Sequence, residues 1–180
     1  MIAGELAPVT EALLRTLGRH SRQGYLRGVL RDAGLENPEL LRATSDRPYP
    51  VAWPTQGLNL MLQCLDPQAP EDQRTWGLHS ITLDAARWPG AWLKGLNPAT
   101  ATPEDLVNLL AAGSTEALCT PDMACLTVPG VDGQTWSVVA LFDALSKKLK
   151  TLTFTRTGDW VSASVLPPWP VADVGGQKSL

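Results

Sequence analysis

The sequence predicts an α+β domain, in which N-terminal helices precede a mostly antiparallel sheet with one further helix packed on it. Two patterns lead to this class. Up to residue 47, apolar residues recur every three or four positions, the spacing of a helix with one buried face. From Gly57 they alternate, the spacing of a strand with one buried face. We expect one domain over 1–165, helical at 1–47 and sheet-forming at 57–165, and a poorly ordered tail rich in Pro and Gly at 166–180.

The helical part contains two amphipathic segments, and each ends at a glycine. The first, "PVTEALLRTLG", ends at Gly18, and the second, "GYLRGVLRDAG", ends at Gly34. The basic segment "GRHSR" between them is interpreted as a linker, and "NPELLRA" is expected to add a short third turn. Three prolines within residues 48–54 then require an extended chain, which ends the helical part.

The sheet part begins with two strands of similar length. In "GLNLMLQCL", Leu58 and Leu60 point to one side of the strand and Asn59 to the other. The loop "DPQAPEDQR" separates this segment from "WGLHSITLDA", so we expect an antiparallel hairpin. Further strands, joined by turns, are expected at "MACLTV", "TWSVVALFD", "LKTLTFTR" and "WVSASV".

A helix over residues 103–112 is expected between the first hairpin and the later strands. The hydroxyl of Thr102 can accept a hydrogen bond from the amide of Asp105, and Pro103 lacks the amide that would otherwise be unpaired. The acids Glu104 and Asp105 face the positive end of the helix dipole. Because this helix is too short to be stable alone, its leucine stripe is expected to dock on the sheet.

Charge is unevenly distributed along the chain, although the net charge is only −3. Residues 1–50 carry seven Arg and six acids, residues 51–146 carry three basic residues and ten acids, and residues 147–180 carry five basic residues and two acids. The acidic middle disfavours a nucleic-acid partner and favours a basic protein partner, unless these acids simply line solvated loops. Since the chain has neither an apolar run long enough to cross a membrane nor a signal peptide, we expect a cytoplasmic protein without a membrane partner.

Residues that could carry out chemistry are scattered along the sequence. His20 and His79 have no second histidine or cysteine at ligand spacing, and the three cysteines lack such spacing too, so no metal and no cofactor is expected. A couple between His79 and Asp84 would need a bulge, because residues five apart on a strand point to opposite faces; a buried or cross-strand histidine is the alternative. No nucleophile elbow, phosphate-binding loop or dinucleotide fingerprint occurs, so we expect no catalytic residues and no enzyme.

Two of the seven tryptophans, Trp88 and Trp92, stand in "WPGAW", which Pro89 and Gly90 keep out of regular structure. Two interpretations are open. Either ring can close the edge of the core over the following helix, or it can anchor a partner, since tryptophan is enriched at protein interfaces.

The order of these motifs resembles a group of bacterial immunity proteins, which neutralise toxins delivered by contact-dependent systems such as type VI secretion effectors and S-type pyocins. The resemblance covers about residues 14–157. It rests on the helical "LG" segment, the "GLNL" and "HSITL" strands, the "WPG" loop that leads to a helix with a threonine start, and the hairpin that begins at Trp136. The segment "LLAAGSTEAL" departs from the family's pattern, in which this helix runs into "LG-x-P".

The resemblance implies a protein that inhibits by binding one toxin domain, often a basic nuclease, and it transfers no inhibitory residue by position. We expect a monomer or weak dimer in the free state. From the charge distribution and the tryptophan loop, the candidate partner-binding residues are Asp66, Glu71, Asp72, Asp122 and Asp132, with Trp88 or Trp92 as an aromatic anchor.

Two other function classes are open. A secretion chaperone is also small, acidic and α+β, but the prolines at 167, 168 and 170 disfavour the C-terminal helix that such chaperones usually carry. A small enzyme or ligand-binding domain would need a cluster of titratable residues, which the sequence pattern disfavours.

Overall fold

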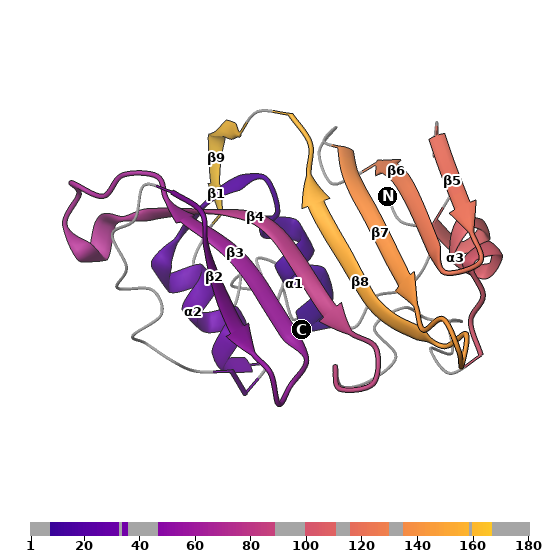
Figure 1. Ribbon diagram of the computed structural model, residues 1–180. Coiled ribbons are helices and arrows are strands. Elements are labelled where there is room, and N and C mark those ends of the chain that lie inside the picture. Colours follow the sequence, from indigo (N-terminus) through magenta and orange to yellow (C-terminus); the bar gives the residue numbers. More distant parts are fainter. Residues whose placement is uncertain are drawn as a thin grey trace, which may run out of the picture.

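Helices cover one face of a long, mostly antiparallel sheet, as the computed structural model in Figure 1 shows. The structure describes residues 8–32, 34–35, 47–88, 100–110, 116–129, 135–158 and 160–166. The turn expected at 37–43 and the last two residues of the helix expected at 103–112 lie outside the described residues, as does the tail expected at 166–180, except for Leu166, which belongs to a strand. Within the described ranges, the helices are α1 (Pro8–Thr16), α2 (Gln23–Asp32) and α3 (Pro103–Leu110). The predicted α+β class is confirmed.

The strands of the described chain join into one sheet. They are β1 (Arg19–Arg22), β2 (Tyr49–Trp53), β3 (Leu58–Cys64), β4 (Thr75–Asp84), β5 (Glu116–Thr120), β6 (Met123–Pro129), β7 (Thr135–Phe142), β8 (Leu149–Arg156) and β9 (Val161–Leu166). The main path runs β2-β3-β4-β8-β7-β6-β5, and each neighbouring pair in it is antiparallel. β1 lies beside the first half of β4, and β9 pairs with β1 in parallel.

One face of this sheet supplies most of the hydrophobic core. Ile81, Phe154, Val138 and Leu126 lie opposite one another across β4, β8, β7 and β6, and all four are buried. Leu106 of α3 belongs to the same buried cluster, and α3 contacts β5, β6 and β7. The predicted docking of this helix on the sheet is therefore confirmed.

The start of α3 has the predicted cap. The amide of Asp105 donates to Thr102 Oγ1 at 3.1 Å, and the amide of Thr102 donates back to Asp105 Oδ2 at 2.8 Å. The two bonds satisfy donors that the first helical turn leaves without an intrahelical partner. The hydrogen bonds from Thr102 also lower the pKa of the Asp105 carboxyl below its ordinary value.

β3 and β4 form the predicted hairpin, with a bulge that the alternation pattern does not reveal. Met61 pairs with Ser80 and Leu62 pairs with Leu78, so His79 is an extra residue on β4. A bulge of this kind re-aims the side chain that it inserts. The side chain of His79 is half-buried and contacts neighbouring strands on the side away from the core.

Three strands differ from the expectations. The segment interpreted as a basic linker is β1, which pairs with β4 on one side and β9 on the other, and its Arg19 and Ser21 are buried. β9 follows β8 in the sequence but pairs with β1, in parallel. The loop expected before "MACLTV" contains β5, which pairs with β6 through a two-residue turn. Each of these pairings depends on a partner strand whose position is not visible in the local pattern.

Candidate partner-binding surface

The predicted acidic residues lie at two opposite ends of the sheet. Asp66, Glu71 and Asp72 belong to the connection from β3 to the start of β4, which includes the 3-10 turn η2 (Glu71–Gln73). Asp122 belongs to the β5–β6 turn, at the other end of the strands. Because strand order places these connections apart, they cannot form the single acidic surface that was expected. Asp132 and Trp92 lie outside the described residues.

The position of Asp122 follows from the hydrogen bonds between neighbouring strands. The amide of Phe142 donates to the carbonyl of Asp122 at 2.8 Å, so the β5–β6 turn lies beside the end of β7. The next connection, from β7 to β8, lies beside the end of β4, where the amide of Ala85 donates to the carbonyl of Lys150. We call this end of the sheet, with the β5–β6 and β7–β8 connections, the hairpin end, and the opposite end, with residues 65–74, the loop end.

Several of the acids already have partners from the basic flanks of the chain. Glu71 lies 3.8 Å from Arg27, and Asp122 lies 2.8 Å from Lys147. Asp66 Oδ1 accepts a hydrogen bond from the amide of Thr75 at 2.6 Å, which closes the loop. Exposed ion pairs of this kind contribute little stability, but they offset the negative potential that the sequence suggested.

Trp88 closes the core, one of the two roles predicted for it. Its ring is buried, and its Nε1 donates to Thr10 Oγ1 of α1 at 3.0 Å. The ring therefore joins the end of β4 to a helix that lies 78 residues earlier in the chain. A buried ring with a satisfied N–H is not available as an anchor for a partner.

The hairpin end carries the exposed large hydrophobic residues of the described chain. Leu141, on the open face of β7, is 43% exposed, and Leu145, in the β7–β8 turn, is 95% exposed. The turn is ordered, because Asp143 Oδ1 accepts hydrogen bonds from the amides of Leu145 at 3.0 Å and Ser146 at 2.7 Å. These bonds also lower the pKa of the Asp143 carboxyl. Leu145 is thus held in solvent by a closed turn.

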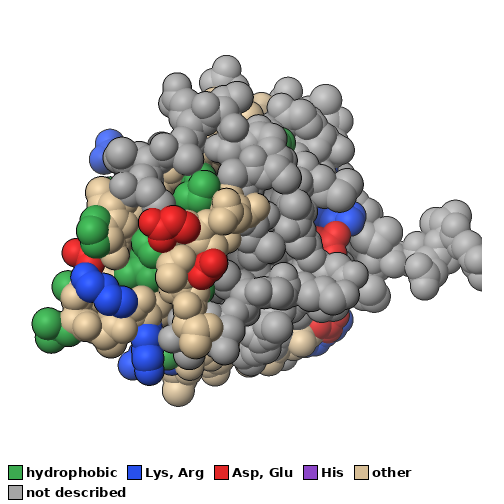
Figure 2. Space-filling view, turned by 90° about the vertical axis from the view of Figure 1, so that its right-hand side faces the viewer, with side chains coloured by type: hydrophobic (Ala, Val, Ile, Leu, Met, Phe, Trp, Pro, Cys, Tyr) green, Lys and Arg blue, Asp and Glu red, His purple; other side chains and the backbone are tan. Residues whose placement is uncertain are grey.

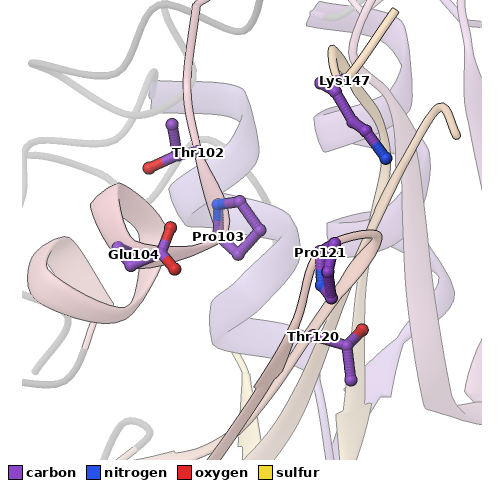
Figure 3. A pocket seen from close by; sticks show the side chains of 6 residues that line it. All are labelled: Thr102, Pro103, Glu104, Thr120, Pro121 and Lys147. Carbon is purple, nitrogen blue, oxygen red and sulfur yellow. The ribbon is translucent and has the colours of Figure 1, made fainter. Parts of the chain in front are cut away.

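A pocket of about 410 Å³ lies beside this turn (Figure 3). Three segments meet around it: the start of α3, the end of β5 with its turn, and the β7–β8 turn. Its lining residues are Thr102, Pro103, Glu104, Thr120, Pro121 and Lys147. Figure 3 shows Lys147 across the opening from Thr102 and Pro103. We refer to this pocket together with Leu141 and Leu145 as the hairpin-end surface.

Sequence reasoning missed this surface. A leucine in "DALSKK" has no periodicity of its own, and its exposure depends on the turn that Asp143 closes. The usable signal was Asp143 itself, since an Asp that starts a short polar segment between strands commonly bonds the amides that follow it.

A second polar cluster lies near the loop end, around His79. Arg156 Nε donates to His79 Nδ1 at 3.3 Å, so His79 Nε2 carries the proton and donates to Gln63 Oε1 at 2.8 Å. Trp160 packs edge-on against His79 with ring centroids 4.7 Å apart, and the guanidinium of Arg156 lies 3.9 Å from the Trp160 ring centroid. Burial, followed by the charge of Arg156, lowers the pKa of His79. The cross-strand interpretation of this histidine is confirmed.

Neither a metal site nor a membrane span stands out in the described chain. Its His, Cys, Asp and Glu side chains nowhere gather in a group of three that could hold a metal ion. In the same ranges, no helix has both the length and the apolarity to cross a bilayer.

No protein-family profile matches this sequence, and no curated protein or solved structure matches it either. The resemblance to immunity proteins therefore stays a prediction from the sequence motifs.

Proposed function

We propose that this chain is an immunity protein, which binds and neutralises a secreted bacterial toxin domain by forming a tight one-to-one complex. The motif order resembles that of such proteins, and the hairpin-end surface is the surface that we propose for the contact. The observation that carries the proposal is the exposure of Leu145, 95% accessible at the tip of an ordered turn beside a pocket.

The composition of the hairpin-end surface suits a protein interface. Leu141 and Leu145 provide exposed apolar side chains at this end of the sheet, and the prolines of the pocket add rigid apolar contacts. In the proposed interface, the Lys147–Asp122 ion pair and Glu104 form the polar rim. Interfaces of high affinity commonly combine an apolar centre that excludes water with such a rim.

The order of the β7–β8 turn also favours tight binding. The amide of Lys147 donates to the carbonyl of Asp143 at 2.9 Å, and the amide of Asp143 donates to the carbonyl of Lys148 at 2.9 Å. A turn that is closed before binding loses little conformational entropy when a partner covers it. The proposed mode of inhibition is therefore occupation of the toxin by a preformed surface, which requires no chemical step.

The proposal predicts that a gene for a secreted toxin lies directly upstream of the gene for this protein, and it is tested with the toxin domain which that gene encodes. Calorimetry of the two purified proteins is expected to show one-to-one binding, and an equimolar amount is expected to abolish toxin activity. A small secreted enzyme encoded elsewhere in the same cells serves as the control, and its activity should not change. Absence of binding, or binding that leaves the toxin fully active, would overturn the proposal.

A further inference from the structure

The main path of the sheet ends in two strands, β2 and β5, and these two differ in how their outer edges are protected; β9 is a third outer strand of the described sheet, because it pairs with β1 alone. β2 contains Pro50, and Pro48 and Pro54 lie just beyond its ends. β5 contains neither proline nor lysine. Proteins commonly protect edge strands with proline or lysine, because an unprotected edge can pair with another chain. β5 is thus the less protected of the two strands that end the main path.

The register shows which backbone groups of β5 point outward. The carbonyl of Asp122 accepts a hydrogen bond from the amide of Phe142. Counting from Asp122, every second residue along β6 therefore forms its backbone hydrogen bonds with β7. The residues between them, beginning with Met123, form theirs with β5. Their partners on β5 are the three residues Glu116, Leu118 and Thr120. The two residues between these, Ala117 and Cys119, therefore direct their amides and carbonyls to the side of β5 that faces away from β6.

We propose that the partner adds an extended strand to the edge of β5, and that this strand carries a basic side chain toward Glu104. The proposal rests on the proposed function, since the partner is the toxin domain. The edge leads directly into the hairpin-end surface, because Thr120, the last residue of β5, lines the pocket there. One continuous contact can therefore use backbone hydrogen bonds along β5 and apolar burial at Leu145.

Charge favours a basic strand over a second copy of this chain. Glu104 is exposed and makes no ion pair within the described part of the chain, and it lines the pocket at the end of β5. Figure 2, which faces the side of the molecule where α3 and β5 lie, shows both acidic and basic side chains among hydrophobic ones in its described part. Antiparallel pairing of two β5 strands would place Glu116 of each copy beside the Asp122 end of the other. Like charges brought together in this way oppose self-association.

The test uses proline to remove one backbone amide that points away from the neighbouring strand, at an alanine of β5 and at an alanine of β2. Ala117→Pro removes an outward amide from β5 and leaves the bonds to β6 in place. Ala52→Pro is the matched control on β2. The amide of Gly57 donates to the carbonyl of Trp53, so the backbone groups of Trp53 point toward β3. Because neighbouring residues of a strand direct their backbone groups to opposite sides, the amide of Ala52 points away from β3. We expect Ala117→Pro to raise the Kd for the toxin by about tenfold or more, and Ala52→Pro to change it by less than about twofold.

Amide exchange of the wild-type protein gives a second readout that does not depend on the folding of a variant. In the complex, exchange at Ala117 and Cys119 should slow by about tenfold or more, whereas exchange at Ala52 should not change. Wild-type binding without protection at these two amides would overturn the strand addition and leave the proposed function standing. Failure of the wild-type protein to bind the toxin would overturn the proposed function, and the strand addition with it.

Discussion

At the loop end of the sheet, polar and charged side chains contact one another, whereas at the hairpin end apolar side chains contact solvent. His79, Gln63, Arg156 and Trp160 satisfy one another near the loop end. At the hairpin end, Leu145 is 95% exposed on a turn that Asp143 closes. The difference teaches that the distribution of charge along a sequence is a poor guide to its binding surface, because folding can pair the charges and leave an apolar residue exposed.

The largest expected effect concerns the one predicted anchor that the structure describes, Trp88. Replacing Trp88 by Ala should lower the free energy of unfolding by about 3–5 kcal/mol, because a buried ring is lost and Thr10 loses its donor. Urea denaturation measures the change, and Trp88→Phe, which keeps most of the packing, should cost less. A stable Trp88→Ala protein with weakened toxin binding would instead make Trp88 a contact residue.

A smaller effect is expected at Gly77, where Trp160 packs on the backbone of β4. A Cβ added at Gly77 would lie 2.5 Å from the Trp160 ring, so Gly77→Ala must displace that ring from His79 and Arg156. We expect a loss of about 1–3 kcal/mol in unfolding free energy. A double variant with Trp160→Ala should lose less than the sum of the two single variants, and strict additivity would show that the ring and the glycine do not interact.

The smallest effect is a dependence of stability on pH. The pKa of His79 in the folded protein is lowered below its ordinary value of 6.5, so the folded state binds fewer protons than the unfolded state. The contribution of neutral His79 to the free energy of unfolding is therefore complete above about pH 6.5, and it is lost as the pH falls through the lowered pKa. Urea denaturation at about pH 7.5 and about pH 5 should show a larger decrease for the wild type than for His79→Gln. Equal decreases would mean that the cluster does not sense protonation.

The sequence predicted those parts of the fold that depend on local chemistry. Alternation placed Trp136 and Phe142 on the buried face of β7, and the Thr102–Asp105 cap marked the start of α3. β1 escaped prediction because four residues show no clear period, and because its parallel partner β9 lies about 140 residues later in the chain.

The candidate site was harder to predict, because it depends on the order of the strands. β8 lies between β4 and β7, and this order separates the acidic loop at Glu71 from the turn at Asp122. Local patterns contain no information on that arrangement. The exposure of Leu145 likewise follows from how the β7–β8 turn closes. In a strand, a shift of one residue would turn a leucine to the opposite face, where it could be buried.

The central claim is that the hairpin end, and not the acidic loop, binds the partner. The most direct test measures the Kd for the toxin of Leu145→Asp beside that of the double variant Glu71→Lys and Asp72→Lys. Ala144→Asp, which places the same charge on the adjacent exposed residue, is the control. Leu145→Asp should raise the Kd by about 30-fold, since loss of an interface hot spot costs about 2 kcal/mol, and the double variant and the control should each change it by less than about threefold. A large increase for the double variant with an unchanged Kd for Leu145→Asp would contradict the account.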